Sequence, residues 1–188
     1  MRVIAGDFKG RQIQAVKGHH TRPTTDKIKE NVFNMIGQFF VGGRVLDLFA
    51  GSGNLGIEAL SRGMDHGVFV DMNVNAINVI KENIVSLKLQ DKTEVYRSDA
   101  TRALGVLAKK DAKFDLIFLD PPYGKISITA LLDLIVEKDL LNHDGLVICE
   151  YLEGRHIQYK VSKLKELKRA EYGKIQILIL KKRKTIGS

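Results

Sequence analysis

Cysteine, proline and long apolar runs are scarce in this 188-residue chain, which has one cysteine and three prolines. A single cysteine, Cys149, excludes a disulfide framework within the chain and favours a reducing cytoplasm. No apolar run approaches the roughly 20 residues that cross a bilayer, and the N-terminus lacks the apolar segment of a signal peptide. We therefore expect a cytoplasmic protein without a membrane span, in which Cys149 is a buried core thiol.

The composition is that of a globular protein with an uneven distribution of charge. Hydrophobic residues make up 44% of the chain, and its length suits one domain with a small appendage. The net charge is +8, with seven Lys/Arg against two acids in residues 1–29 and ten against two in residues 160–188. Residues 30–159 carry thirteen against eighteen. Basic ends around an acidic centre suit a polyanion such as RNA, although a solvated basic surface has the same composition.

The pattern from residue 44 onward predicts an α/β fold. Apolar runs bounded by turn signals predict strands at residues 45–49, 68–70, 93–97, 114–119 and 146–150. Between them, apolar residues at helical spacing predict helices at residues 55–61, 73–87, 102–108 and 128–136. Such alternation is typical of a parallel sheet with helices on both faces. Residues 164–168 and 175–180 predict an antiparallel hairpin at one edge, which completes a seven-stranded, mostly parallel sheet.

Residues 1–40 are predicted to form a small N-terminal extension of a main domain at residues 41–188. Residues 2–6 and 10–13 have the pattern of two short strands joined by a glycine-containing turn. Thr24 or Thr25 is a suitable N-cap for a helix that begins near Asp26. A glycine pair at residues 42–43 ends this segment, and the buried face of the helix is expected to carry Ile28, Val32, Met35, Ile36 and Phe39.

A glycine-rich loop follows the first strand of the main domain and opens a helix. Gly51, Gly53 and Gly56 satisfy the G-x-G-x-x-G pattern. Asp71 ends the next strand, twenty residues after Gly51, where an acid could bind ribose hydroxyls. These features permit a nicotinamide-binding Rossmann domain.

Two acidic features favour S-adenosylmethionine over a dinucleotide. Asp47 brings negative charge close to the loop, which suits the ammonium and sulfonium of that cofactor better than a pyrophosphate. The second feature is the tetrapeptide at residues 120–123, Asp-Pro-Pro-Tyr, which follows the strand at 114–119. Ligands of open α/β sheets bind at such carboxyl strand ends, and hydride transfer does not require this tetrapeptide. His19 and His20 have no second cluster of Cys or His to add ligands, so no metal site is expected.

These motifs together resemble the RsmD-type family of bacterial 16S ribosomal RNA guanine-N2 methyltransferases. The similarity runs nearly end to end and includes the blocks at residues 2–6, 9–11, 21–24, 45–53, 56–63, 120–123 and 172–173. The combination of Thr-Arg-Pro-Thr at 21–24 with Ala-Gly-Ser-Gly at 50–53 is the most specific part. The chain departs from the family at Asp71, where glutamate is frequent, and in the loop before Thr21, which lacks a common proline.

The resemblance implies a Rossmann-like class I methyltransferase fold with S-adenosylmethionine as cofactor. It implies that the cofactor is bound by Asp47, Ala50, Gly51, Gly53, Asp71 and Asp99. Asp71 would accept hydrogen bonds from the ribose and Asp99 from the adenine amino group, although each acid is also a candidate helix cap. The expected partner is 16S rRNA within a small-subunit ribosomal particle, with no obligate protein partner.

The resemblance also assigns the chemistry to Asp120, Pro121 and Tyr123. The carboxylate and the Pro121 carbonyl would accept N–H bonds from the target amine, and the tyrosine would stack on the base. Arg2, Lys9, Arg11, Lys17 and Arg22 are the candidate RNA contacts. Residues 181–184, Lys-Lys-Arg-Lys, are expected to form a solvated tail. Two alternatives stay open: an adenine-N6 methyltransferase of DNA or RNA, and a non-catalytic RNA-binding assembly factor.

Overall fold

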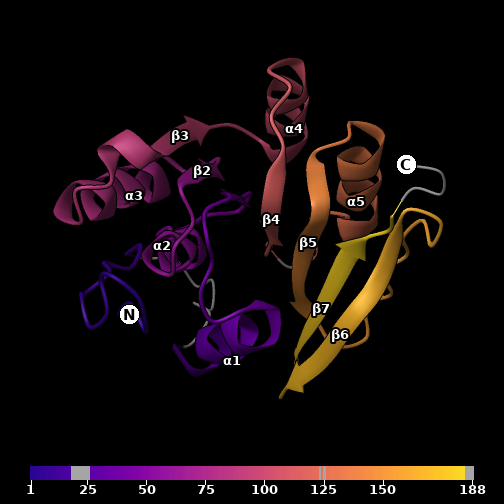
Figure 1. The fold of residues 1–188 in the computed structure, drawn as a ribbon, viewed down its shortest axis with the longest axis horizontal. Helices are drawn as coiled ribbons and strands as arrows, with labels where there is room; N and C mark the ends of the chain where they lie inside the picture. The colour runs from indigo at the N-terminus through magenta and orange to yellow at the C-terminus, as the bar shows by residue number, and fades with distance from the viewer. Residues whose placement is uncertain (18–25, 123, 125, 185–188) are drawn as a thin grey trace.

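The computed structural model describes residues 1–17, 26–122, 124 and 126–184, and its centre is a seven-stranded sheet (Figure 1). The strand order is β3-β2-β1-β4-β5-β7-β6. Strands β1 to β5 pair in parallel, and β7 runs antiparallel to both β5 and β6. The strands are β1 (Arg44–Asp47), β2 (His66–Asp71), β3 (Thr93–Arg97), β4 (Phe114–Leu119), β5 (Leu141–Leu152), β6 (Leu164–Tyr172) and β7 (Ile175–Lys182). The predicted α/β class and C-terminal hairpin are confirmed.

Helices cover both faces of this sheet, because the strands alternate apolar side chains between the two faces. In β4, Leu116 and Phe118 join the core under α1, α2 and α3, whereas Ile117 and Leu119 join the core under α4 and α5. Cys149 belongs to the second core, and burial raises the pKa of its thiol to about 12, which confirms it as a core residue. The helices are α1 (Asp26–Ile36), α2 (Asn54–Ser61), α3 (Val74–Ser86), α4 (Ala100–Lys109) and α5 (Ile128–Glu137), with a short 3-10 turn η1 (Gln90–Lys92).

The N-terminal segment packs directly against the main domain. The two predicted segments pair without forming regular strands: an isolated antiparallel bridge joins Arg2 to Gln12, and the Val3 and Ile13 amides donate to the carbonyl oxygens of Arg11 at 2.9 Å and Met1 at 3.0 Å. The turn lies against α2 so closely that a Cβ on Gly6 would stand 1.9 Å from the carbonyl oxygen of Ser61. Val3 and Ile13 enter the same core as α1, α2 and α3. The described part of residues 1–40 therefore shares its apolar core with the main domain.

Helix α1 begins at Asp26 as predicted but ends at Ile36, earlier than expected. The chain leaves the helix at Gly37, whose φ is 136°. Phe39 consequently lies beyond the helix and is 65% exposed, so its prediction as a buried helical residue is wrong. The proposed caps Thr24 and Thr25 lie outside the described residues.

The first two residues of the C-terminal basic stretch belong to the sheet and not to a solvated tail. Lys181 and Lys182 end β7. The Nζ of Lys182 donates to the carbonyl oxygen of Leu141 at 2.8 Å and to Asp139 Oδ1 at 3.2 Å, and Lys181 lies 3.4 Å from Asp144. These contacts tie β7 to the beginning of β5. The tail prediction is wrong for these two residues. None of the described helices is long and apolar enough to cross a membrane.

Candidate active site

The carboxyl ends of the parallel strands meet at one edge of the sheet and bring acidic side chains together there. Asp47 ends β1 and Asp71 ends β2. Asp120 follows β4 directly, and Asp99 lies two residues beyond β3. Ligands of parallel α/β sheets bind at this edge. The fold therefore gathers the acids predicted from widely spaced positions in the sequence.

The glycine loop between β1 and α2 is held by the carboxylate of Asp71. Asp71 Oδ2 accepts a hydrogen bond from the Gly51 amide at 2.9 Å, and Oδ1 accepts one from the Asn73 amide at 2.9 Å. Gly51 has a φ of 57°, and a Cβ at this position would meet no atom within 4 Å. The backbone at Gly51 is thus open to a ligand, and the conformation favours glycine. The N-cap of α3 is Asn73, so the capping alternative for Asp71 is wrong.

The third glycine of the loop serves packing instead of ligand access. A Cβ on Gly56 would stand 2.5 Å from the ring of Phe69, and the backbone therefore approaches β2 as only glycine allows. The Gly56 amide also donates to Asp47 Oδ2 at 3.0 Å. This hydrogen bond fixes the carboxylate of Asp47 beneath the loop.

Asp47 is a buried acid whose charge the protein does not fully stabilise. Its exposed fraction is 3%. Burial raises the pKa of its carboxyl to about 7; the Gly56 hydrogen bond opposes this shift and the charge of Asp71 adds to it. A cationic ligand near this carboxylate would favour its ionised form. The surroundings of Asp47 therefore fit the sulfonium and ammonium groups of S-adenosylmethionine.

Asp99 is the N-cap of α4, as the capping alternative predicted. Its Oδ1 accepts from the Arg102 amide at 2.8 Å, and the helix begins at Ala100, two residues earlier than expected. The Asp99 side chain is exposed at the carboxyl ends of the strands. A contact of Asp99 with adenine stays a prediction.

A second part of the site lies between the segment that follows β4 and the end of β5 with the residues after it. Pro121 is buried and Pro122 is exposed, and both line a cleft of about 400 Å³. This volume lies within the range of small-molecule sites. The opposite wall contains Glu150, Tyr151, Arg155 and His156, which the sequence interpretation did not single out. Tyr123 lies outside the described residues, so its stacking role stays a prediction.

Glu150 shows the signal that sequence inspection could have used. Like Asp47, Asp71 and Asp120, it is an acid that directly follows an apolar strand run. Leu119 pairs with Cys149 in the parallel register, so Asp120 and Glu150 are neighbours across the two strands. Both residues line a small cavity of about 10 Å³ together with Val32 and Leu55. Asp120, the first residue of the Asp-Pro-Pro-Tyr tetrapeptide, thus lies beside a second acid, Glu150 of β5.

The predicted RNA contacts that the structure describes lie on the surface of the N-terminal segment. Arg2, Lys9, Arg11 and Lys17 are all exposed. Arg11 also donates from Nη2 to the carbonyl oxygen of Ser86 at 2.9 Å, which places it beside the end of α3. Arg22 lies outside the described residues.

The strand order, the C-terminal antiparallel hairpin and the glycine loop after β1 define a class I methyltransferase. The solved structure of "Putative methyltransferase yhhF from Escherichia coli" matches with a TM-score of 0.83 at 25% identity, over 98% of this chain and 99% of that one. A family model described as "Conserved hypothetical protein 95" matches residues 1–181. The chain belongs to this family, the RsmD-type methyltransferases expected from the sequence.

Two relatives support the assignment along most of the chain. "Putative rRNA methyltransferase YlbH" of Bacillus subtilis is 50% identical over 97% of this chain and 100% of its own length. "Ribosomal RNA small subunit methyltransferase D" of Haemophilus influenzae is 31% identical over 80% of this chain and 78% of its own length. The methyltransferases of this family depend on S-adenosylmethionine, which confirms the predicted cofactor and decides against the nicotinamide alternative.

Proposed function

We propose that this protein transfers a methyl group from S-adenosylmethionine to the exocyclic N2 of a guanine in 16S ribosomal RNA. The observation that carries the proposal is the position of Asp120 and Pro121 at the end of β4, beside a cleft of about 400 Å³ and at the same sheet edge as the glycine loop. The names of the two relatives, both rRNA methyltransferases, support RNA as the substrate. Such a substrate places the reaction in the cytoplasm, on naked RNA or on a small-subunit particle.

The cofactor would be held by the glycine loop and the acids around it. Gly51 and Gly53 let the backbone approach the methionine portion, with Ala50 beside them. Each oxygen of Asp71 already accepts one backbone amide and keeps a further lone pair for a ribose hydroxyl. Asp99 Oδ2 would accept the adenine amino group. When bound, the cofactor supplies an electrophilic methyl group.

Asp120 and Pro121 would prepare the target amine for methyl transfer. The exocyclic nitrogen of guanine is a weak nucleophile, because its lone pair is delocalised into the ring. If the Asp120 carboxylate and the Pro121 carbonyl accept its two N–H bonds, the lone pair is directed away from them and toward the methyl donor. The carboxylate then stabilises the positive charge that develops on nitrogen and accepts the proton that leaves. Tyr123 would stack on the base once it is splayed out of the RNA.

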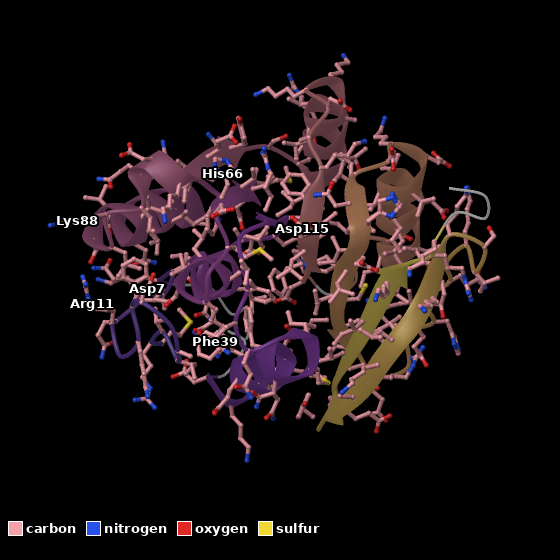
Figure 2. All side chains as sticks on the ribbon, in the orientation of Figure 1. Asp7, Arg11, Phe39, His66, Lys88 and Asp115 are labelled. Carbon is pink, nitrogen blue, oxygen red and sulfur yellow. The ribbon has the colours of Figure 1, made fainter. Side chains whose placement is uncertain are left out.

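The N-terminal segment would bind the RNA backbone. Arg2, Lys9, Arg11 and Lys17 of this segment are exposed. Arg11 and Lys88, at the end of α3, lie on the same side of the molecule (Figure 2). Contacts of this kind position a nucleic acid without reading its sequence. In this proposal residues 1–40 are the RNA-binding extension and residues 41–188 the methyltransferase domain.

The direct test is incubation with labelled S-adenosylmethionine and small-subunit RNA from an unmodified strain, followed by nucleoside mass spectrometry. We expect N2-methylguanosine, formed by the wild-type protein and not by Asp120→Ala. Formation of N6-methyladenosine would replace the proposal with the adenine alternative. Calorimetric binding of the cofactor without any methylated nucleoside, on naked RNA and on small-subunit particles, would support the non-catalytic assembly factor.

A further inference from the structure

Glu150 is a buried acid at the point where β5 extends past the end of β4. Its exposed fraction is 5%, and it lines both the 400 Å³ cleft and the small cavity that contains Asp120. We infer that Glu150 determines base specificity by accepting the N1–H of the target guanine, beside the N2 amine held by Asp120. This inference rests on the proposed function and adds the residue that selects guanine.

The strand geometry places the two acids on one face of the sheet. Phe118 and Ile148 both face the core under α1, α2 and α3. Side chains two residues apart on a strand point to the same face, so Asp120 and Glu150 follow Phe118 and Ile148 onto that face. The pairing of Leu119 with Cys149 sets them side by side on neighbouring strands. The small cavity confirms this arrangement, because its other walls include Val32 of α1 and Leu55 of α2.

Two neighbouring carboxylates match the hydrogen-bonding edge of guanine. An ionised carboxylate only accepts hydrogen bonds and has about four lone-pair sites. The Watson–Crick edge of guanine presents donors at N1 and at N2, so one acid can serve each position. Adenine presents an acceptor at N1, which cannot donate to the Glu150 carboxylate. Binding adenine would leave this buried carboxylate without the N1–H hydrogen bond, at a cost in binding free energy of the order of 1–3 kcal/mol or more. The same pair therefore accepts guanine and disfavours adenine.

The cleft provides room for the rest of the nucleotide. Pro121 lines one wall of it, and Glu150, Arg155 and His156 line the other. Arg155 reaches across toward the segment after the prolines, since its Nη2 lies 3.4 Å from the Cβ that Gly124 would carry. Enzymes that modify a base in RNA bind it splayed out and form hydrogen bonds to its Watson–Crick edge. Glu150 is the acid in this cleft that adjoins Asp120.

The test uses 2-aminopurine, which keeps the N2 amine but has an acceptor at N1. Small-subunit RNA is assembled by splinted ligation with guanine or 2-aminopurine at the nucleotide that mass spectrometry identifies as methylated. We expect wild-type kcat/KM to be at least about 100-fold lower for 2-aminopurine, because sites that bind an N–H reject analogues that lack it. Glu150→Gln should bring the two substrates within about tenfold of each other, because the glutamine amide can accept the N1–H of guanine with its oxygen or donate to the N1 of 2-aminopurine with its nitrogen.

A matched control is Glu153→Gln, which changes an exposed acid three residues away and should keep the wild-type ratio. Comparing ratios between variants cancels any difference in intrinsic reactivity of the two bases. An unchanged ratio in a folded Glu150→Gln protein that binds cofactor would overturn the inference. If that variant does not fold, the wild-type ratio decides, and equal turnover of both bases overturns it. Absence of N2-methylguanosine from the wild-type reaction would instead reject the proposed function.

Discussion

Glu58→Gln would place an amide where the structure has a carboxylate surrounded by four donors. Glu58 Oε1 accepts from the Ile4 amide at 2.9 Å and lies 3.0 Å from Lys29 Nζ. Its Oε2 accepts from the Ala5 amide at 3.1 Å and from Arg62 Nε at 2.8 Å. The side chains of Glu58 and Lys29 are fully buried. In glutamine an NH2 group replaces one of these oxygens, so its hydrogens would face the N–H donors that the oxygen had accepted from. The buried cations Lys29 and Arg62 would also lose their negatively charged partner.

The expected loss is about 3–5 kcal/mol of unfolding free energy, the range for removing one partner of a buried ion pair. For a domain of this size that loss lowers Tm by roughly 10–15 °C. Lys29→Met should be milder, at about 2 kcal/mol, because the Glu58–Arg62 pair remains balanced. Its loss comes from the unsatisfied carbonyl oxygen of Arg2 and Asn54 Oδ1, each 2.7 Å from the lysine Nζ. Burial lowers the pKa of Lys29, so removing its charge also relieves a desolvation penalty.

The assay is urea and thermal unfolding at pH 7, with Glu82→Gln on the exposed face of α3 as a control expected within about 0.5 kcal/mol of wild type. An equal or larger loss in Lys29→Met, or a loss below about 1 kcal/mol in Glu58→Gln, would refute the electrostatic reasoning. Glu58→Gln leaves one acceptor oxygen for the Ile4 and Ala5 amides, so one of these amides loses its hydrogen bond. RNA affinity should therefore fall in this variant at a temperature where the fold persists.

Four further predictions concern the site and its supports. Asp120→Ala should reduce single-turnover methyl transfer by about 10³-fold while calorimetry shows cofactor affinity within a few fold; retained turnover would contradict the mechanism. The pKa of Asp47 is about 7 in the folded state against 3.8 in the unfolded state. The neutral carboxyl therefore favours the folded state fully below pH 3.8, and this contribution to the unfolding free energy is lost as pH rises through 7. Relative to Asp47→Asn, wild type should lose about 3 kcal/mol between pH 5 and pH 8 in urea unfolding, and parallel curves would contradict this. Gly56→Ala should cost at least about 1–3 kcal/mol through the Phe69 contact, whereas Gly105→Ala, with open space at its Cβ, should stabilise α4 by up to about 1 kcal/mol; equal effects would reject the packing argument. Lys9→Ala should weaken RNA binding regardless of sequence and reduce the salt-dependence slope by about one, and a sequence-specific loss would point to base contact instead.

Local pattern was sufficient where each element is specified by its own neighbours. Strands at 93–97 and 114–119 form at the predicted bounds, because alternating or continuous apolar runs between turn signals have few other solutions. Local pattern gave wrong predictions where contacts between residues distant in sequence determine the structure. Phe39 has helical spacing, yet the helix ends before it. Lys182 appeared to belong to a tail, but pairing of β7 with β5 gives its amine partners about forty residues away.

The sequence alone determined the class of protein, because the glycine loop and the Asp-Pro-Pro-Tyr tetrapeptide are local motifs whose chemistry depends on adjacent residues. Only the tertiary structure decided what stands beside them. Glu150 lies thirty positions from Asp120 in the chain, and it became a neighbour through the parallel register of β4 and β5. The N-terminal segment likewise depends on Glu58, which accepts hydrogen bonds from the Ile4 and Ala5 amides more than fifty residues away in the chain. Such pairings arise from strand register and core packing, which short-range pattern does not encode.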